Sequence, residues 1–381
     1  MVNKKGITLT VLSILHFFVD FVCVSILYMC CRELILSTTQ IIIAIILYNF
    51  FAFLTQPFLG LLIDKIPEEK KERIYKALVV FSFVSIYFAI LIFHFITRIF
   101  DGDVFFEIRA FLCVPFLGIG NSIFHVVGGK ISLLMSKKAM PGGIFVSTGA
   151  IGVGLAAFYN YTSFLANNQF DIFYSITLIP AIFVVIFSFL EFDVSDLKYE
   201  EETKRTKFAI LFVLFLCAAV VIRSFLGTYV KIGINTGWNF IFLLGVFACL
   251  GKAIGGIILD LFGPYPLIGI STLVAVVFSL LIIDSPSTEI IYDYNGVAFV
   301  FGFNMLMPLT LDWLRKKYPN KEGFAFGLTA ALLIPGYFLG SAFKGSGPQK
   351  IIIPILCFVT GAMLIALKIY SDRKQKNERN D

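Results

Sequence analysis

The stretch that decides the fold runs from Gly118 to Gly154 and reads GIGNSIFHVVGGKISLLMSKKAMPGGIFVSTGAIGVG. It contains two apolar, glycine-rich runs separated by a short turn that carries Lys137 and Lys138. The first run also carries the polar residues Asn121 and His125. A polar or ionisable side chain inside a bilayer costs free energy unless it faces a partner or a wet cavity. The stretch therefore predicts two membrane-spanning helices that border a polar interior.

The remainder of the chain has the composition of a polytopic membrane protein. Of its 381 residues, 58% are hydrophobic and only 15% are charged, and the mean hydropathy is +0.89. The apolar runs are unbroken, which favours spanning helices of about 20 residues over the alternating strands of a transmembrane barrel. We therefore predict an all-α fold of twelve transmembrane helices. The segments are 7–31, 39–63, 75–97, 108–133, 141–164, 171–190, 207–229, 237–260, 264–283, 290–314, 322–341 and 350–371.

A long polar interruption and a repeated motif divide these helices into two sets of six. The longest interruption, EFDVSDLKYEEETKRTK, runs from Glu191 to Lys207. The turn after the second segment contains GLLID, from Gly60 to Asp64, and the turn after the eighth contains GIILD, from Gly256 to Asp260. We expect a six-helix half over residues 1–190, a cytoplasmic loop over 191–206, a second half over 207–371 and a polar tail over 372–381. Two parallel repeats are one known plan for secondary transporters.

The distribution of basic residues predicts the orientation. Of the 31 Lys and Arg residues, six lie on the side opposite to the termini: Arg32, Arg98, Arg109, Lys231, Lys344 and Lys350. Arg223 lies within a segment, and the others gather on the side of both termini, with Lys252 near a helix end. Because positive loops stay inside, both termini are predicted to be cytoplasmic in a multi-pass inner-membrane protein. The net charge of +6 is thus an orientation signal and does not indicate a nucleic-acid partner.

The twelve-helix plan and the two G-x-x-x-D turns resemble the major facilitator superfamily over essentially the whole chain. Within it, GIGNSIFH, the basic turn, the glycine pair and GAIGVG resemble the fosmidomycin-resistance branch of drug exporters. The resemblance implies a monomeric secondary active transporter that uses alternating access, with Gly60, Asp64, Gly256 and Asp260 as gating residues. For the two aspartates, solvated turns are the alternative. The branch has prolines at the positions of Val126 and Ala156, and the direction of transport is left open.

His16 and Asp20 are four residues apart and so share one face of the first segment. An ionisable pair at that depth is typical of a site that binds and releases a proton. We therefore assign proton coupling to Asp20 and His16. The alternative is that the two side chains only form hydrogen bonds with each other or with a neighbouring helix.

Three further positions are assigned to solute binding together with a buried arginine. Asn121 and His125 follow helical spacing with the glycines of the fourth segment, and Asn304 lies in the matching run FGFNMLMP. These side chains line a cavity or join helices. Arg223 lies sixteen residues beyond Lys207, too deep to reach the surface easily. It needs either an anionic solute or a carboxylate partner, for which Asp20 is the nearest candidate.

The sequence lacks the signs of other chemistry. It has no P-loop, its three His residues have no metal-ligand spacing, and its seven Cys residues lie in apolar runs without a disulfide pattern. We therefore expect no cofactor, no metal and no enzymatic activity. The expected partners are a small organic solute, protons and the lipid bilayer. Drug export, uptake of an organic anion and a non-transporting receptor stay open as functions.

Overall fold

The computed structural model of the protein describes residues 4–33, 37–99, 103–164, 169–192, 207–230, 239–284, 291–344 and 348–380. Within these residues every regular element is a helix. Eleven helices are long and apolar enough to cross a membrane, and the shorter Ser175–Phe189 is also apolar. The predicted all-α, multi-pass fold is therefore confirmed.

The first six spans, called the N-terminal spans here, are formed by α1 to α7. Their elements are α1 (Lys4–Glu33), α2 (Thr38–Asn49), the π-helix η1 (Phe50–Leu54), α3 (Gln56–Ile63), the short η2 (Glu68–Lys70), α4 (Lys71–Ile99), α5 (Asp103–Leu134), α6 (Met140–Phe164) and α7 (Gln169–Phe189).

The last six spans, called the C-terminal spans, are formed by α8 to α15. Their elements are α8 (Lys207–Tyr229), α9 (Asn239–Phe262), α10 (Pro264–Asp284), α11 (Ile291–Asn304), α12 (Met307–Lys317), α13 (Glu322–Ala331), α14 (Leu333–Ala342) and α15 (Gln349–Asn380). The last helix continues through residues 372–380, which were expected to be a separate polar tail. These residues are mostly Lys, Arg, Gln and Glu, which favour helix even when they leave the membrane.

Three of the predicted spans are interrupted helices. Proline explains each interruption, because it lacks an N–H group and clashes with the preceding turn. Pro57 follows the π-helix η1, Pro308 follows the break between α11 and α12, and Pro335 follows the break between α13 and α14. Hydropathy alone predicts these spans as continuous because the interruptions are apolar.

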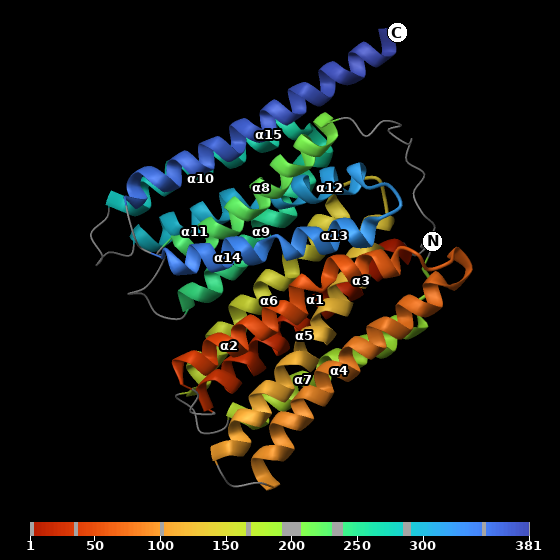
Figure 1. The fold of residues 1–381 in the computed structure, drawn as a ribbon, viewed down its shortest axis with the longest axis vertical. Coiled ribbons are helices and arrows are strands. Elements are labelled where there is room, and N and C mark those ends of the chain that lie inside the picture. The colour runs from red at the N-terminus through yellow and green to blue at the C-terminus, as the bar shows by residue number, and fades with distance from the viewer. Residues whose placement is uncertain are drawn as a thin grey trace.

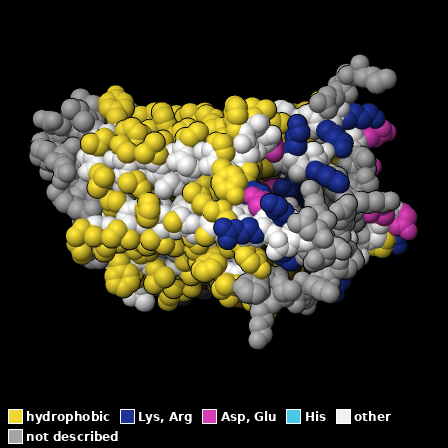
Figure 2. All heavy atoms as spheres, turned by 90° about the horizontal axis from the view of Figure 1, so that it is seen from above, with side chains coloured by type: hydrophobic (Ala, Val, Ile, Leu, Met, Phe, Trp, Pro, Cys, Tyr) yellow, Lys and Arg dark blue, Asp and Glu magenta, His cyan; other side chains and the backbone are white. Residues whose placement is uncertain are grey.

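The N-terminal and C-terminal spans lie side by side in the bundle (Figure 1). One buried apolar cluster joins mainly the N-terminal spans, and two smaller ones join the C-terminal spans. Large apolar side chains such as Phe58, Leu178, Phe189 and Leu273 are exposed on the outside. Figure 2 shows this hydrophobic surface, with Lys and Arg side chains gathered toward one end. Such a surface is what a bilayer requires.

The end of the bundle where α1 begins and α15 ends is called the terminal side (Figure 1). Lys4 Nζ lies 2.9 Å from Glu191 Oε2, so the end of the N-terminal spans returns to this side. Lys5 Nζ donates a hydrogen bond to the Met135 carbonyl at 3.0 Å, which places the turn between α5 and α6 there as well.

Candidate functional site

A polar cluster lies between α1 and α5, in the interior of the N-terminal spans. His16 and Asp20 come from α1, and Asn121 and His125 come from α5. The two His Nε2 atoms are 2.8 Å apart, and each lies 3.4 Å from one Asp20 carboxylate oxygen. Asn121 donates from Nδ2 to Asp20 Oδ1 at 3.3 Å. The i, i+4 spacing on each helix places both pairs on the facing surfaces, which brings all four side chains together.

The backbone fixes which nitrogen of each imidazole carries a hydrogen. His16 Nδ1 lies 2.6 Å from the Phe145 carbonyl oxygen, and His125 Nδ1 lies 2.9 Å from the Asn121 carbonyl oxygen. A carbonyl only accepts hydrogen bonds, so both Nδ1 atoms are donors. In two neutral rings the Nε2 lone pairs would then face each other. A proton shared between the two Nε2 atoms would turn this 2.8 Å contact into a hydrogen bond, and the Asp20 carboxylate would balance its positive charge.

The spacing also decides how well a metal ion would fit. His16, Asp20 and His125 offer three ligand atoms within 4.8 Å of one another. A tetrahedral zinc ion, with Zn–N bonds of about 2.0–2.1 Å, holds two nitrogen ligands about 3.3 Å apart. The observed 2.8 Å is instead the length of a hydrogen bond. The cluster therefore fits a proton better than a tetrahedral metal ion.

Glycines on α6 allow this helix to pack directly on the cluster. A Cβ atom on Gly149 would lie 2.2 Å from Asp20 Oδ2 and 2.6 Å from His16 Nε2. One on Gly152 would lie 2.3 Å from the Phe17 carbonyl oxygen. Any larger residue would displace the cluster, so these glycines are required for its geometry.

A cavity of about 190 Å³, the central cavity, lies against the cluster. Its lining includes His16, Asp20 and His125 from the N-terminal spans, and Lys252, Phe326 and Thr329 from the C-terminal spans. Phe53, on η1, lines it too, and π-helical turns often occur at functional sites. Its polar side chains are those of the cluster on one wall and Lys252 and Thr329 on the other, and the remainder of the lining is apolar, which suits a small solute with polar and apolar parts.

Lys252 lines the central cavity, whereas the sequence predicts it to lie near a helix end. It lies near the middle of α9 and donates a long, 3.4 Å hydrogen bond to the Val146 carbonyl on α6. It precedes Asp260 by eight residues, which is about 12 Å along a helix. Because Asp260 marks the end of the span, this spacing is the sequence signal that places Lys252 inside the membrane.

The other assigned solute-binding residues lie elsewhere. Asn121 donates a hydrogen bond to Asp20 but does not line the central cavity. Asn304 donates to the Val300 carbonyl of its own helix at 2.8 Å. Of the two alternatives left open for Arg223, pairing with Asp20 is not found, because the described contacts of Asp20 are with His16, His125 and Asn121. Arg223 instead lines a second cavity, inside the C-terminal spans.

The repeated G-x-x-x-D motifs lie at the terminal side, where the N-terminal and C-terminal spans meet. Asp64 accepts hydrogen bonds from the backbone N–H groups of Gly323 and Phe324 at 2.9 Å, at the start of α13. Lys130 Nζ also lies 2.7 Å from Asp64 Oδ1. Gly60 packs so closely that a Cβ atom there would lie 2.4 Å from the Gly323 backbone. The carboxylate thus caps the N-terminus of a helix from the other set of spans.

The second motif makes the same kind of contact in the opposite direction. Asp260 accepts from the backbone N–H groups of Ala139 and Met140 at 2.8 and 2.7 Å, at the start of α6. A Cβ atom on Gly256 would lie 3.2 Å from Met140 Cα. Each set of spans therefore caps one helix of the other, and the two contacts are related by the internal repeat.

Arg315, at the end of α12, adds a third connection at the terminal side. It donates to the carbonyl oxygens of Leu133, Ser136 and Lys137 at 2.9, 2.8 and 2.7 Å. It also pairs with Asp312 at 2.5 Å. Cations are favourable at a helix C-terminus, here that of α5. Asp64, Asp260 and Arg315 thus join the two sets of spans at this side. Each of them belongs to one set and binds backbone groups of the other.

Comparison with known proteins identifies the fold. The family model described as Major Facilitator Superfamily matches residues 9–343. A variant of the E. coli fucose:proton symporter FucP has a similar structure, with a TM-score of 0.68, 13% identity, and coverage of 96% of this chain and 99% of that one. The proton:xylose symporter XylE has a TM-score of 0.62 and 13% identity, with coverage of 97% and 95%.

No curated protein matches the sequence, and the family match extends to the superfamily without naming a branch. The match spans most of the chain, the solved structures share its architecture over nearly their whole length, and the helices have the length and composition that this architecture requires. The chain therefore belongs to the Major Facilitator Superfamily.

Proposed function

We propose that the protein is a proton-coupled secondary active transporter that moves a small organic solute across the cytoplasmic membrane by alternating access. The observation that carries the proposal is the 2.8 Å contact between the Nε2 atoms of His16 and His125, which offers a place for a shared proton beside Asp20 in the wall of the central cavity. FucP and XylE, which share the fold, are proton symporters by name.

The cluster would couple proton and solute through its charge. With the shared proton, the imidazolium and the Asp20 carboxylate balance each other. Without it, a carboxylate and two opposed lone pairs remain in a largely apolar interior, which disfavours the present packing. Loss of the proton would therefore favour rearrangement of α1 against α5, and binding of a solute in the adjoining cavity would respond to that rearrangement.

The contacts at the terminal side would form the gate. Basic residues gather at this end (Figure 2), so the positive-inside tendency favours a cytoplasmic position for it. Asp64, Asp260 and Arg315 close this side by binding backbone groups across the interface. The structure then corresponds to a state closed toward the cytoplasm, and opening requires the two capped helices to leave their aspartates.

The cavity lining supports two classes of solute. Phe53, Met307 and Phe326 offer an apolar surface for an amphipathic compound, as the resemblance to drug exporters implies. Lys252 supports an organic anion, because among the described residues no carboxylate lies within 4 Å of its ammonium group. A screen that compares matched neutral and anionic analogues separates these classes.

The experiment that tests the proposal begins with a thermal-shift screen of metabolites and drugs on the purified protein, because a bound ligand raises the apparent stability of the folded state. The compound found is then offered to proteoliposomes that enclose a pH-sensitive dye. Solute flux with a matching pH change is expected. Binding without flux would instead favour a receptor built on the same fold, and flux without a pH change would remove proton coupling.

A further inference from the structure

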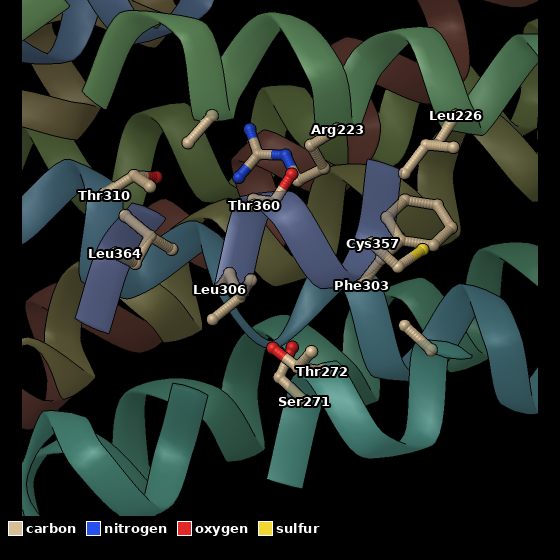
Figure 3. A pocket seen from close by; sticks show the side chains of 12 residues that line it. Arg223, Leu226, Ser271, Thr272, Phe303, Leu306, Thr310, Cys357, Thr360 and Leu364 are labelled. Atoms are coloured by element: carbon tan, nitrogen blue, oxygen red, sulfur yellow. The ribbon is translucent and has the colours of Figure 1, made fainter. Parts of the chain in front are cut away.

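The second cavity lies within the C-terminal spans, between α8, α10, α11, α12 and α15, and Arg223 lines it (Figure 3). None of its twelve lining residues is shared with the central cavity, and none carries a carboxylate. Apart from Arg223 the lining is formed by apolar side chains and by hydroxyl-bearing residues. The cavity thus surrounds one permanent positive charge with a surface that cannot neutralise it.

The guanidinium of Arg223 has no described partner. The side chain is buried, with 6% of the residue exposed, and neither Nη1 nor Nη2 has a hydrogen-bond partner among the described residues. Arginine stays protonated in proteins. Burying an unpaired charge is costly, and a water molecule in the cavity would not remove the net charge. The site therefore lacks a negative charge.

One hydroxyl group in the same cavity is also free to donate. The hydroxyls of Ser271, Thr310 and Thr360 donate to the carbonyls of Gly302, Met307 and Leu356. Thr272 Oγ1 is buried and has no hydrogen-bond partner within the described part of the chain. Arg223 and Thr272 thus present unused donors from α8 and α10, on opposite sides of the cavity (Figure 3).

The size of the cavity limits the ligand. It has about 20 Å³ of free volume, and one water-sized species needs about 10–15 Å³. That space admits one small anion. The missing charge and the unused donors indicate an anion, and the volume indicates a small one, of which a halide ion is the simplest.

We propose that the C-terminal spans hold a buried halide site, physiologically for chloride, formed by the Arg223 guanidinium and the Thr272 hydroxyl. The ion would neutralise Arg223 and join α8 to α10 and α15 within this set of spans. This proposal does not depend on the proposed function, because the site shares no residue with the central cavity or with the polar cluster of His16, Asp20, Asn121 and His125.

The test measures the thermal stability of the purified full-length protein in sodium gluconate while NaCl or NaBr replaces it at constant ionic strength. A ligand of the folded state raises the apparent Tm with the logarithm of its concentration above Kd. We expect such a rise for the wild type and none for Arg223→Gln. Lys65→Gln, which removes an exposed cation at the terminal side, should respond to halide as the wild type does.

Thr272→Val provides a second variant of nearly the same shape. Loss of one hydrogen bond to a charged group should raise the halide concentration needed for a given Tm shift about tenfold. In crystals grown with bromide, an anomalous peak is expected between the Arg223 guanidinium and Thr272 Oγ1. A wild-type Tm that does not depend on halide, an equal response in Arg223→Gln, or an equal response to sulfate would each overturn the proposal.

Discussion

Two buried charged centres that each line a cavity differ in how their charge is compensated. In the N-terminal spans, His16, Asp20 and His125 form a group that balances its own charge when it holds one proton. In the C-terminal spans, Arg223 has no partner among the described residues and faces a small cavity. A centre that is balanced only with a proton is suited to exchange it, whereas a centre with a permanent charge is suited to keep an ion.

The largest expected effect is that of Asp20→Asn, which removes the only carboxylate of the proton cluster. The shared proton would then place an uncompensated positive charge in the interior, so the cluster should no longer hold it. We expect solute accumulation driven by a pH gradient to fall about 100-fold in proteoliposomes, to the level of protein-free vesicles. Retention of wild-type accumulation would exclude Asp20 from coupling.

The control for this variant is His94→Gln, which changes the one histidine outside the cluster. It should keep wild-type coupling. A size-exclusion profile like that of the wild type would show that Asp20→Asn still folds, so that its loss of transport is assigned to the cluster.

The next largest effect concerns the two histidines, which would act as one unit if they share a proton. His16→Gln and His125→Gln should each lower gradient-driven accumulation about tenfold. The double variant should lose little more, because the effects of two substitutions that break the same hydrogen bond do not add. The measurement is a double-variant cycle on the same transport assay. A hundredfold loss in the double variant would mean that the histidines act separately.

A smaller difference is expected between Asp64 and Asp260, the two aspartates proposed to act in the gate. Both cap a helix N-terminus, but Asp64 also neutralises Lys130, which is only 1% exposed. Asp64→Asn should favour opening of the terminal side about tenfold, and Asp260→Asn should do so by a smaller factor. Spin labels on Lys70→Cys and Lys321→Cys, in a cysteine-free background, report the separation of the two sets of spans. Equal shifts would contradict the role given to Lys130.

The smallest expected effect is that of metal removal, for which we predict no change. The 2.8 Å separation of the His Nε2 atoms fits a proton rather than tetrahedral zinc. Treatment with EDTA should therefore leave solute accumulation within experimental error of the untreated protein. Loss of transport on chelation, restored by added zinc, would show that the cluster opens to bind a metal ion.

The sequence predicts the spans well because each is a local property of its own residues. Continuous apolar runs identify all twelve, and the i, i+4 spacing of His16 and Asp20 places them on one face. The repeated motifs also indicate where Asp64 and Asp260 lie. Interruptions at Pro57, Pro308 and Pro335 are less apparent, because hydropathy does not register a lost backbone hydrogen bond.

Contacts between distant helices are not available from the sequence in the same way. The partners of Asp64 and Asp260 are backbone N–H groups, which every residue has, so no side-chain pattern marks them. The sequence left Arg223 either an anionic solute or Asp20 as its partner, and it could not show that His125 and Asn121 on α5 contact Asp20 instead. The depth of Lys252 in the membrane depends on where α9 ends, which hydropathy locates only to within several residues, so the sequence placed Lys252 near a helix end.

The most direct test of the shared proton is nitrogen-15 NMR of histidine-labelled protein. The chain has three His residues, so His94→Gln leaves only His16 and His125 in the spectrum. We predict that both Nδ1 atoms carry a hydrogen and that one proton is shared between the two Nε2 atoms. Two neutral rings without a shared proton, or an unprotonated Nδ1 in either ring, would contradict the account.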